Sequence, residues 1–316
     1  MSVKKIIQNL IWTCLPKFLK VRIKDIYDSK RASLQLQNFR YIISNDEIDK
    51  LFMNLNVNSD LMIHSSFPDI GKLQSPKYVC NKIYEIINNN HTVLFPAIPI
   101  KGSTLEFLKK EKEIDFRTLS NAMGYLSVKF EKEKDSYRSL NPTHSVVAIG
   151  ERAEWYTSEH HFDETPFTVK SPYYKLLKSR GKILMFGATL DHLTILHVLE
   201  DMLGSLFPYN IYSKSYTVKI ITKNNENFIS KYRTHNKLSG ILRDNTKVNK
   251  FIKELPSTKV YKVGAGEVVL IDSKDLFILV LNLMKQGIST MGRVYISKEC
   301  CNEIDYWINK IENDDL

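Results

Sequence analysis

The stretch Asn141–Gly150 reads NPTHSVVAIG. Asn-Pro is typical of a turn, and the apolar run that follows is typical of a buried strand. His144 stands between two hydroxyl residues where the turn meets the strand, so its side chain can face a cleft instead of a core. A histidine in this place is either a general base or a side chain that local hydrogen bonds satisfy.

Helical and strand patterns alternate on both sides of this block. A helix capped by Asn45 or Asp46 is expected to carry Ile48, Leu51 and Phe52. Further helices are predicted over Pro76–Asn88, Asn121–Lys132, Tyr173–Arg180, Leu193–Leu203 and Lys274–Met284. Strands are predicted over Leu61–Phe67, His91–Pro96 or Pro99, Lys182–Ala188 and Tyr216–Thr222, with a hairpin over Val260–Asp272 that turns at Gly264–Gly266. The alternation predicts an α/β fold, with three layers (α/β/α) around a mixed sheet.

Charge and cysteines restrict the functional class. The net charge is +10, and residues 1–24 contribute six cations and no acid, which leaves +4 on the rest of the chain. So small an excess argues against a broad nucleic-acid face. Cys14, Cys80, Cys300 and Cys301 fit neither a disulfide framework nor a zinc knuckle, which favours packing roles in a reducing compartment, hence the cytoplasm. We also expect no signal peptide and no bilayer-spanning segment.

Residues 1–40 form a predicted appendage to a domain of residues 41–316. Ile6, Ile7, Leu10 and Ile11 recur at helical spacing between lysines. One interpretation is a basic amphipathic helix on an anionic membrane surface, through residues 1–24. The other is a helix that packs on the body or on a second subunit, which leaves a homodimer open.

Two further blocks carry polar groups among apolar residues. LTILHVLED places His197 and Glu200 three residues apart and so on one helical face. LMIHSSFPDIGKL places His64, Ser65 and Ser66 where a strand runs into a loop, and backbone N–H groups and hydroxyls of such a loop can face a ligand.

In this order and spacing, these blocks resemble the aminoglycoside 3-N-acetyltransferase family over roughly residues 45–295. The resemblance implies a fold unlike that of the GNAT acetyltransferases, and acetyl-CoA or another short acyl-CoA as co-substrate. It makes His144 the general base and Glu200 the carboxylate that orients it. His197 would either contact the substrate or support the site.

The same resemblance assigns the ligand contacts. CoA would lie against His64, Ser65, Ser66, Thr92, Arg117 and Ser145. The family usually has a glycine-rich turn where this chain has Asn89-Asn90-His91-Thr92, so a glycine is missing there. Arg117 could instead form a surface ion pair with Asp115, and Ser120 is expected to cap a helix.

The loop His160–Glu164 (HHFDE) has no spacing diagnostic of a metal site, and we expect no metal. Asp163 and Glu164 in this loop could attract a cationic amino sugar or simply be solvated. The predicted function is therefore acetyl transfer to an amine of an amino sugar, either an aminoglycoside or a sugar destined for surface polysaccharide. Two rivals remain: an inactive CoA- or sugar-binding relative, and a membrane-surface scaffold.

Overall fold

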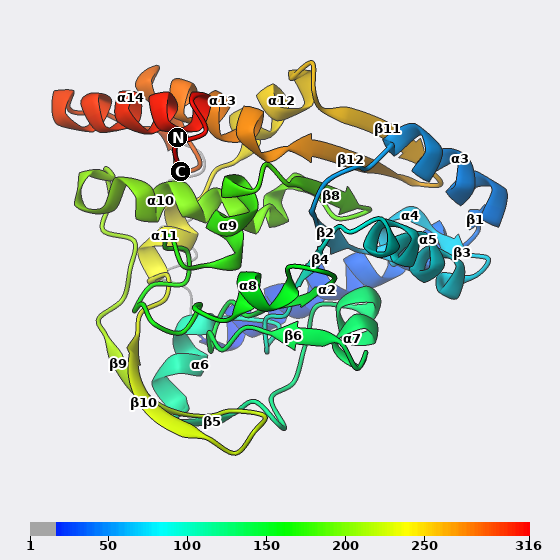
Figure 1. Ribbon diagram of the computed structural model, residues 1–316, viewed down its shortest axis with the longest axis horizontal. Coiled ribbons are helices and arrows are strands. Elements are labelled where there is room, and N and C mark those ends of the chain that lie inside the picture. The colour runs from blue at the N-terminus through cyan, green and yellow to red at the C-terminus, as the bar shows by residue number, and fades with distance from the viewer. Residues whose placement is uncertain (1–16) are drawn as a thin grey trace.

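A seven-stranded mixed sheet forms the centre of the computed structural model, which describes residues 17–316 (Figure 1). Its strand order is β11-β12-β8-β2-β4-β7-β6. β2 is parallel to β4 and β8, whereas the outer pairings are antiparallel. The strands are β2 (Leu61–Ser65), β4 (Val93–Pro96), β6 (Ser136–Arg138), β7 (Val146–Ile149), β8 (Lys182–Phe186), β11 (Lys259–Val263) and β12 (Gly266–Asp272).

Side chains of each inner strand alternate between two hydrophobic cores because successive residues of a strand point to opposite faces. On β2, Met62 enters one core while Leu61 and Ile63 enter the other. The first core is covered by α8 (Ala153–Thr157), α9 (Pro172–Lys178), α10 (Val198–Leu203), α12 (Thr246–Glu254), α13 (Ser273–Lys285) and α14 (Lys298–Glu312). The second is covered by α3 (Asn45–Leu55), α5 (Pro76–Asn88) and α7 (Tyr125–Glu131). The predicted three-layer α/β/α architecture is thus confirmed.

A smaller sheet lies beside the main one and has its own core. Its order is β10-β9-β5, from β10 (Asn227–Tyr232), β9 (Tyr216–Ile221) and β5 (Glu113–Asp115). The remaining elements are α4 (Phe67–Ile70), α6 (Thr104–Lys110), α11 (Lys237–Leu242), β1 (Ile42–Ile43), β3 (Lys72–Leu73), β13 (Ile288–Ser289), β14 (Gly292–Arg293) and the 3₁₀ turns η1 (Leu190–His192), η2 (Thr194–His197) and η3 (Gly204–Leu206).

Helix boundaries are where the sequence predictions needed correction. The cap of α3 is Ser44, whose hydroxyl accepts from the Glu47 amide while the Glu47 carboxylate bonds back in a capping box. Ser120 caps no helix: its hydroxyl donates to the Pro99 carbonyl oxygen at 2.6 Å, and α7 begins only at Tyr125. The segment predicted as one helix over Leu193–Leu203 divides into η2 and α10. The packing role of cysteine is confirmed for Cys80 and Cys300, which are buried.

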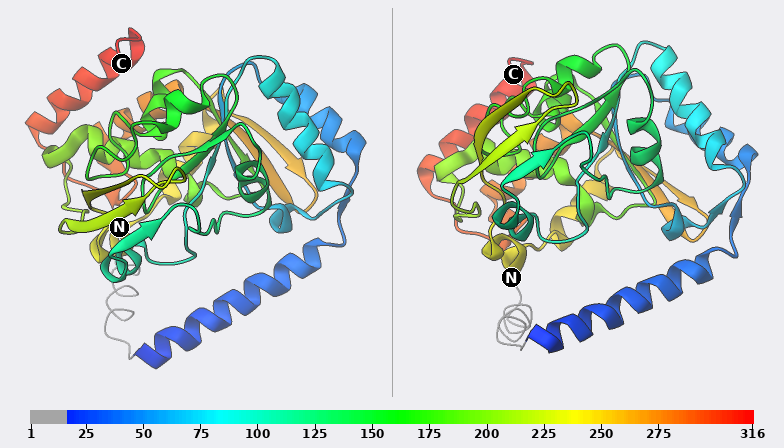
Figure 2. Two further views of the ribbon diagram at one scale, coloured as in Figure 1. Left: turned by 60° about the horizontal axis from the view of Figure 1, so that its bottom comes forward. Right: turned by 90° about the horizontal axis from the view of Figure 1, so that it is seen from below.

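Helix α2 (Lys17–Asn38) precedes the folded body (Figure 2). In both views it runs along one side of the molecule and meets the body near its C-terminal end. There, Arg31 and Gln35 bond to the Asp69 carboxylate and Asn38 bonds to the neighbouring carbonyls. The apolar stripe predicted over residues 6–11 lies outside the described residues. None of the described helices is both long and apolar enough to cross a bilayer.

Candidate active site

Glu200 is the centre of a buried polar cluster. It lies on α10 with 2% of its surface exposed. Its Oε2 is 3.0 Å from Nδ1 of His197 and 2.9 Å from Nε2 of His235, while its Oε1 accepts from Arg243 at 2.6 Å. The predicted alignment of His197 and Glu200 on one face is therefore confirmed.

The carboxylate fixes the protonation of both rings. An ionised carboxylate only accepts hydrogen bonds, so each ring nitrogen that contacts it carries the proton. For His197 the 3.0 Å contact with the carboxylate favours the proton on Nδ1, which leaves Nε2 as the acceptor, although Nη2 of Arg243, which can only donate, also lies 3.1 Å from Nδ1. The rings of His197 and His235 lie 4.2 Å apart, and Tyr212 stacks on His235 at 5.2 Å.

The electrostatics keep this arrangement in one charge state. Burial alone would raise the pKa of Glu200, but the adjacent His197 and Arg243 hold it well below the usual range. Burial also lowers the pKa of His197. Near neutral pH the site therefore combines an ionised carboxylate with a neutral imidazole, which is the pairing that a general base requires.

His144 lies beside this cluster without joining it. Its Nδ1 is 2.9 Å from the Thr143 hydroxyl, and its ring is 6.1 Å from that of His235. The residue is 6% exposed, and burial lowers its pKa well below the usual value. The Asn141 turn is present, with the Asn141 side chain accepting from the His144 amide. The Glu200 carboxylate bonds to His197, His235 and Arg243 and makes no hydrogen bond to His144 among the described residues, so its pairing with His144 stays a prediction.

The same cluster offers three ligand atoms that could surround a cation. The donors of His197, Glu200 and His235 lie within 4.8 Å of one another. Arg243 already supplies a positive charge to this carboxylate and lies 3.1 Å from His197 Nδ1. A metal ion would have to displace that guanidinium, so the donor set fits a histidine base better than a metal centre.

A pocket of about 640 Å³ opens beside Glu200. Phe167, whose ring is 4.9 Å from both His144 and His197, forms part of its wall. We call it the aromatic pocket; its lining residues are Thr165, Phe167, Thr168, Val169, Tyr174, Glu200, Asp201, Met202, Gly204, Ser205, Phe207, Tyr209, Asn210, Ile211, Tyr212, Arg233 and Trp307. A volume of this size accommodates a monosaccharide.

The predicted CoA residues fall into two groups, of which the first lies at the carboxyl end of β2. His64 is buried, its Nε2 has no hydrogen-bond partner, and burial lowers its pKa to about 3. Ser66 donates to the Asp69 carboxylate at 2.5 Å, and Ser65 is half-buried. An orphaned buried nitrogen at a strand end is what a ligand contact would satisfy.

The second group is directed elsewhere. Thr92 precedes β4, and because β2 and β4 are parallel it lies at the opposite end of the sheet from Ser65. It is fully buried, bonded to Arg152 and Asp60. Ser145 is also fully buried, donating to the Ala97 carbonyl and accepting from Arg138. Neither hydroxyl is free for a cofactor, which argues against both predicted contacts.

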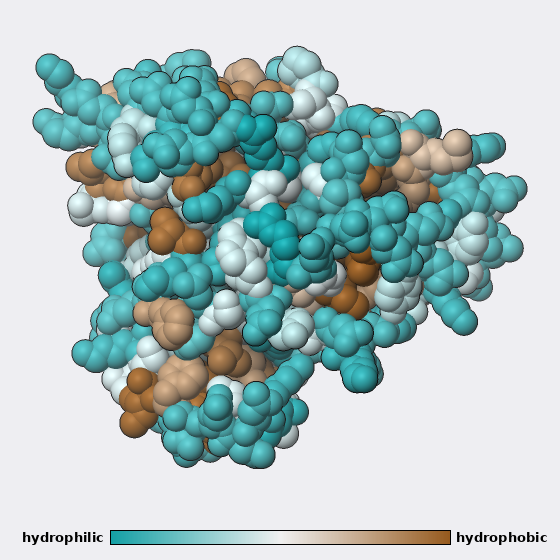
Figure 3. Space-filling view, viewed as in Figure 1, coloured by the Kyte–Doolittle hydropathy of each residue, from teal (hydrophilic) through white to brown (hydrophobic). Residues whose placement is uncertain are grey.

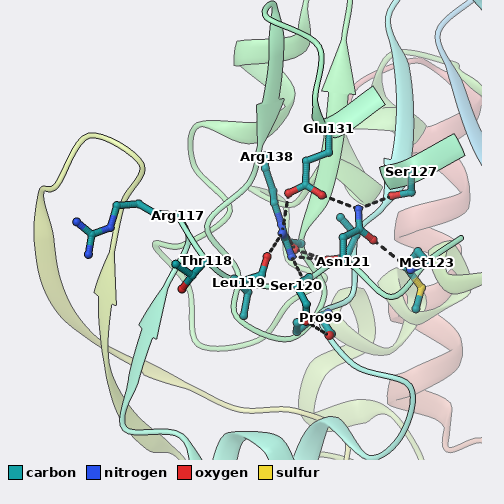
Figure 4. Close-up of polar contacts among 12 residues, drawn as sticks. Pro99, Arg117, Thr118, Leu119, Ser120, Asn121, Met123, Ser127, Glu131 and Arg138 are labelled. Carbon is teal, nitrogen blue, oxygen red and sulfur yellow. Dashed lines mark hydrogen bonds and ion pairs between the residues drawn. The ribbon is translucent and has the colours of Figure 1, made fainter. Parts of the chain in front are cut away.

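Arg117 also points away from the strand ends. Figure 4 shows it apart from the Arg138–Glu131 pair, which braces the neighbouring loop. It forms an exposed ion pair with Asp115, 2.6 Å long, and bonds to Asn225. The surface ion pair, one of two alternatives from the sequence, is what the structure contains.

Replacing Arg117 by Ala is therefore expected to leave CoA affinity unchanged. Exposed ion pairs contribute about 0–1 kcal/mol, so unfolding free energy should fall by no more than about that amount. Calorimetric titration with CoA and denaturant unfolding would measure both. A tenfold weaker CoA affinity of the variant would show that Arg117 does contact the cofactor.

The predicted substrate acids are largely engaged. Asp163 bonds to Thr168 at 2.7 Å and to Lys170 at 3.0 Å. Glu164 is exposed and its carboxylate accepts from Ser215 at 3.3 Å. Neither lines the aromatic pocket. Their attraction for a cationic sugar stays a prediction.

Sequence reasoning missed His235, Arg243, Asp201 and Tyr212. His235 and Arg243 come from the segment after β10 and reach Glu200 across 35 and 43 positions. No short motif marks them. The sequence feature that could have drawn attention to His235 is its place in a polar stretch, RTHNK, shortly after the predicted alternating strand.

Replacing Glu200 by Gln should destabilise the fold, because it removes the counter-charge of Arg243 from a buried site. Breaking a buried ion pair on one side costs about 3–5 kcal/mol. Glu164→Gln is the matched control, since Glu164 is exposed, and it should change unfolding free energy by less than about 0.5 kcal/mol. Equal effects of the two variants in urea unfolding would show that the cluster contributes little.

Comparisons with known proteins identify the family and the fold. The family model described as aminoglycoside 3-N-acetyltransferase matches residues 62–285. Aminoglycoside N(3)-acetyltransferase III of Pseudomonas aeruginosa is 44% identical over 64 residues, which is 20% of this chain and 23% of that protein. Aminoglycoside N(3)-acetyltransferase VII of Streptomyces paromomycinus is 34% identical over 79 residues, 25% of this chain and 27% of that protein. These matches thus span about a quarter of each relative.

Solved structures resemble the whole fold. AAC-IIIb in a binary complex with CoASH matches with a TM-score of 0.63 and 22% identity, over 79% of this chain and 98% of that one. Aminoglycoside acetyltransferase AAC(3)-Xa matches with a TM-score of 0.63 and 17% identity, over 91% and 98%. At these identities the likeness concerns the fold, and it is to enzymes outside the GNAT fold, as predicted. With its family model matched over most of its length, the chain belongs to the aminoglycoside 3-N-acetyltransferase family.

Proposed function

We propose that this protein is an N-acetyltransferase that moves the acetyl group of acetyl-CoA to an amine of an amino sugar. The observation that carries the proposal is the hydrogen bond between Glu200, which lines the aromatic pocket, and His197, which lies directly behind that wall. Family membership and the CoASH-bound relative support the choice of co-substrate. The cytoplasm remains the predicted location.

In this proposal His197 replaces His144 as the general base. Glu200 holds Nδ1–H of His197, so Nε2 can take the proton of the acceptor amine as its nitrogen attacks the thioester carbonyl. The C–S bond breaks as the acetyl carbon forms the amide bond, and the departing CoA thiolate takes up the proton that Nε2 removed from the amine. His144 packs behind this pair, against Phe167 and His235, as a supporting residue.

CoA is placed at the carboxyl end of β2. His64 Nε2 and the Ser65 hydroxyl are polar groups there that a bound pantetheine arm could engage. We place the acceptor in the aromatic pocket, because Glu200 lies on its wall.

Release of free CoA thiol from acetyl-CoA, measured with a panel of amino sugars, tests the proposal. Acceptor-dependent release with intersecting initial-rate lines, indicating a ternary complex, is expected. Binding of acetyl-CoA without any acceptor-dependent release would favour an inactive binding relative. A trapped acetyl-enzyme would contradict direct transfer.

The N-terminal segment supplies a separate test. Residues 1–24 hold six cations, each worth about 1 kcal/mol near an anionic membrane. A variant without them should keep transfer to a soluble amine and lose salt-sensitive binding to anionic liposomes in flotation. If that variant drops from dimer to monomer, the segment is a subunit contact and the membrane interpretation fails.

A further inference from the structure

The aromatic pocket carries little negative charge for a site that would bind a polycationic aminoglycoside. Its lining includes two carboxylates, Glu200 and Asp201. Glu200 is already matched by Arg243 at 2.6 Å. Asp201 accepts from the Phe167 amide at 3.1 Å, and burial raises its pKa. Desolvating several ammonium groups of one ligand would require more carboxylates than these two provide.

A cation also lines the pocket. Arg233 donates through Nε to the Ser213 carbonyl at 2.9 Å, and its guanidinium lies 5.6 Å from the Tyr212 ring centre. Its two Nη groups have no hydrogen-bond partner among the described residues 17–316. The Nε contact fixes the guanidinium plane, so the free Nη groups can bind an anion with two parallel hydrogen bonds.

The rest of the wall is aromatic. Six rings come from four helices or loops: Phe167, Tyr174, Phe207, Tyr209, Tyr212 and Trp307. Figure 3 shows hydrophobic side chains in the band between α10 and α14, the helices that carry Glu200 and Trp307. Aromatic faces pack against the C–H faces of a sugar ring. They also attract ammonium groups, but more weakly than carboxylates do, so they do not replace carboxylates in binding the second and third ammonium groups of one ligand.

We propose that the acceptor is a sugar with a single amine and an anionic group, of the sugar-phosphate class, whose anion binds Arg233. This inference rests on the proposed function, since it names the acceptor of the same site. The sugar ring would lie on the aromatic wall with its amine at the Glu200 end of the pocket, where the Glu200 carboxylate contacts His197. A polycationic aminoglycoside would place several charges against Arg233 and the aromatic rings.

The test is a comparison of kcat/KM in the thiol-release assay. The acceptors are amino-sugar 1-phosphates with the amine at position 2, 3, 4 or 6, their matched methyl glycosides, and sisomicin. For at least one amino-sugar phosphate, kcat/KM should exceed the values for its methyl glycoside and for sisomicin by about 10–100-fold. That factor corresponds to the free energy of a charged hydrogen bond. Arg233→Gln should remove that preference, whereas Lys231→Gln, an exposed cation on β10, should retain it.

Each other outcome is informative. Preference for sisomicin, or equal rates for phosphate and methyl glycoside, would overturn this inference while leaving N-acetyl transfer intact. A higher KM for acetyl-CoA in Arg233→Gln would assign the pocket to CoA and also overturn it. Failure of every acceptor, with acetyl-CoA still bound, would refute the proposed function itself.

Discussion

His197→Gln is expected to lower kcat for acetyl transfer by about 10²–10⁴-fold, the usual loss when a general base is removed. The glutamine amide can still donate to Glu200, which keeps the buried carboxylate paired, but it has no basic nitrogen. Steady-state thiol release at saturating acetyl-CoA measures the loss. The affinity for CoA should stay unchanged, because His197 is the last residue of η2 and does not lie at the carboxyl end of β2.

A second large effect is expected from acid. His64, His144 and His160 are each no more than 7% exposed, and burial lowers the pKa of each, to about 3 for His64 and His160. Their unfolded pKa is about 6.5, so the unfolded chain takes up protons below that pH and the folded chain does not. Stability is therefore fully present above pH 6.5 and is lost as the pH falls toward the folded pKa.

The expected size follows from linkage. Well below pH 6.5 each histidine removes about 1.4 kcal/mol per pH unit, so a fall from pH 7 to 5 removes about 6 kcal/mol in all. That is comparable with the whole stability of many domains, which predicts unfolding near pH 5. Urea unfolding between pH 7 and 5 would measure it.

The pH slope also identifies the source of the acid effect. His160 bonds to Ser139 and to the Pro166 carbonyl, each at 2.8 Å, and after protonation both ring nitrogens would donate, so the Ser139 hydroxyl would have to accept. His160→Gln should reduce the slope by about a third even if it lowers stability at every pH. A flat profile in the parent protein would contradict the account.

The sequence predicted the layers well because each inner strand is a short apolar run and each covering helix has an apolar face. The buried strand that begins at Leu61 and the helix Pro76–Asn88 both occur where they were predicted. Helix boundaries were predicted less accurately where several nearby residues could cap the helix. Ser44 caps α3 in place of the two predicted residues, and Ser120 bonds to a loop carbonyl and caps no helix. Local hydrogen bonding of this kind depends on neighbours that no periodicity encodes.

The site was predicted in part. The spacing of His197 and Glu200 revealed their contact because residues three apart meet on a helix. The partners that decide which histidine Glu200 holds, His235 and Arg243, arrive from a distant segment. Without them, His144 beside its turn was the more conspicuous histidine. Thr92 was misplaced for a related reason, since only the parallel pairing of β2 and β4 shows that it lies at the far end of the sheet.

The choice between the two histidines is the central claim, and one paired measurement decides it. His197→Gln and His144→Gln should be assayed together for acceptor-dependent thiol release, with circular dichroism to confirm that both are folded. The account predicts a loss of at least about 100-fold for His197→Gln and less than about 10-fold for His144→Gln. Near-normal turnover by a folded His197→Gln variant, with activity abolished in His144→Gln, would contradict it and return the base to His144.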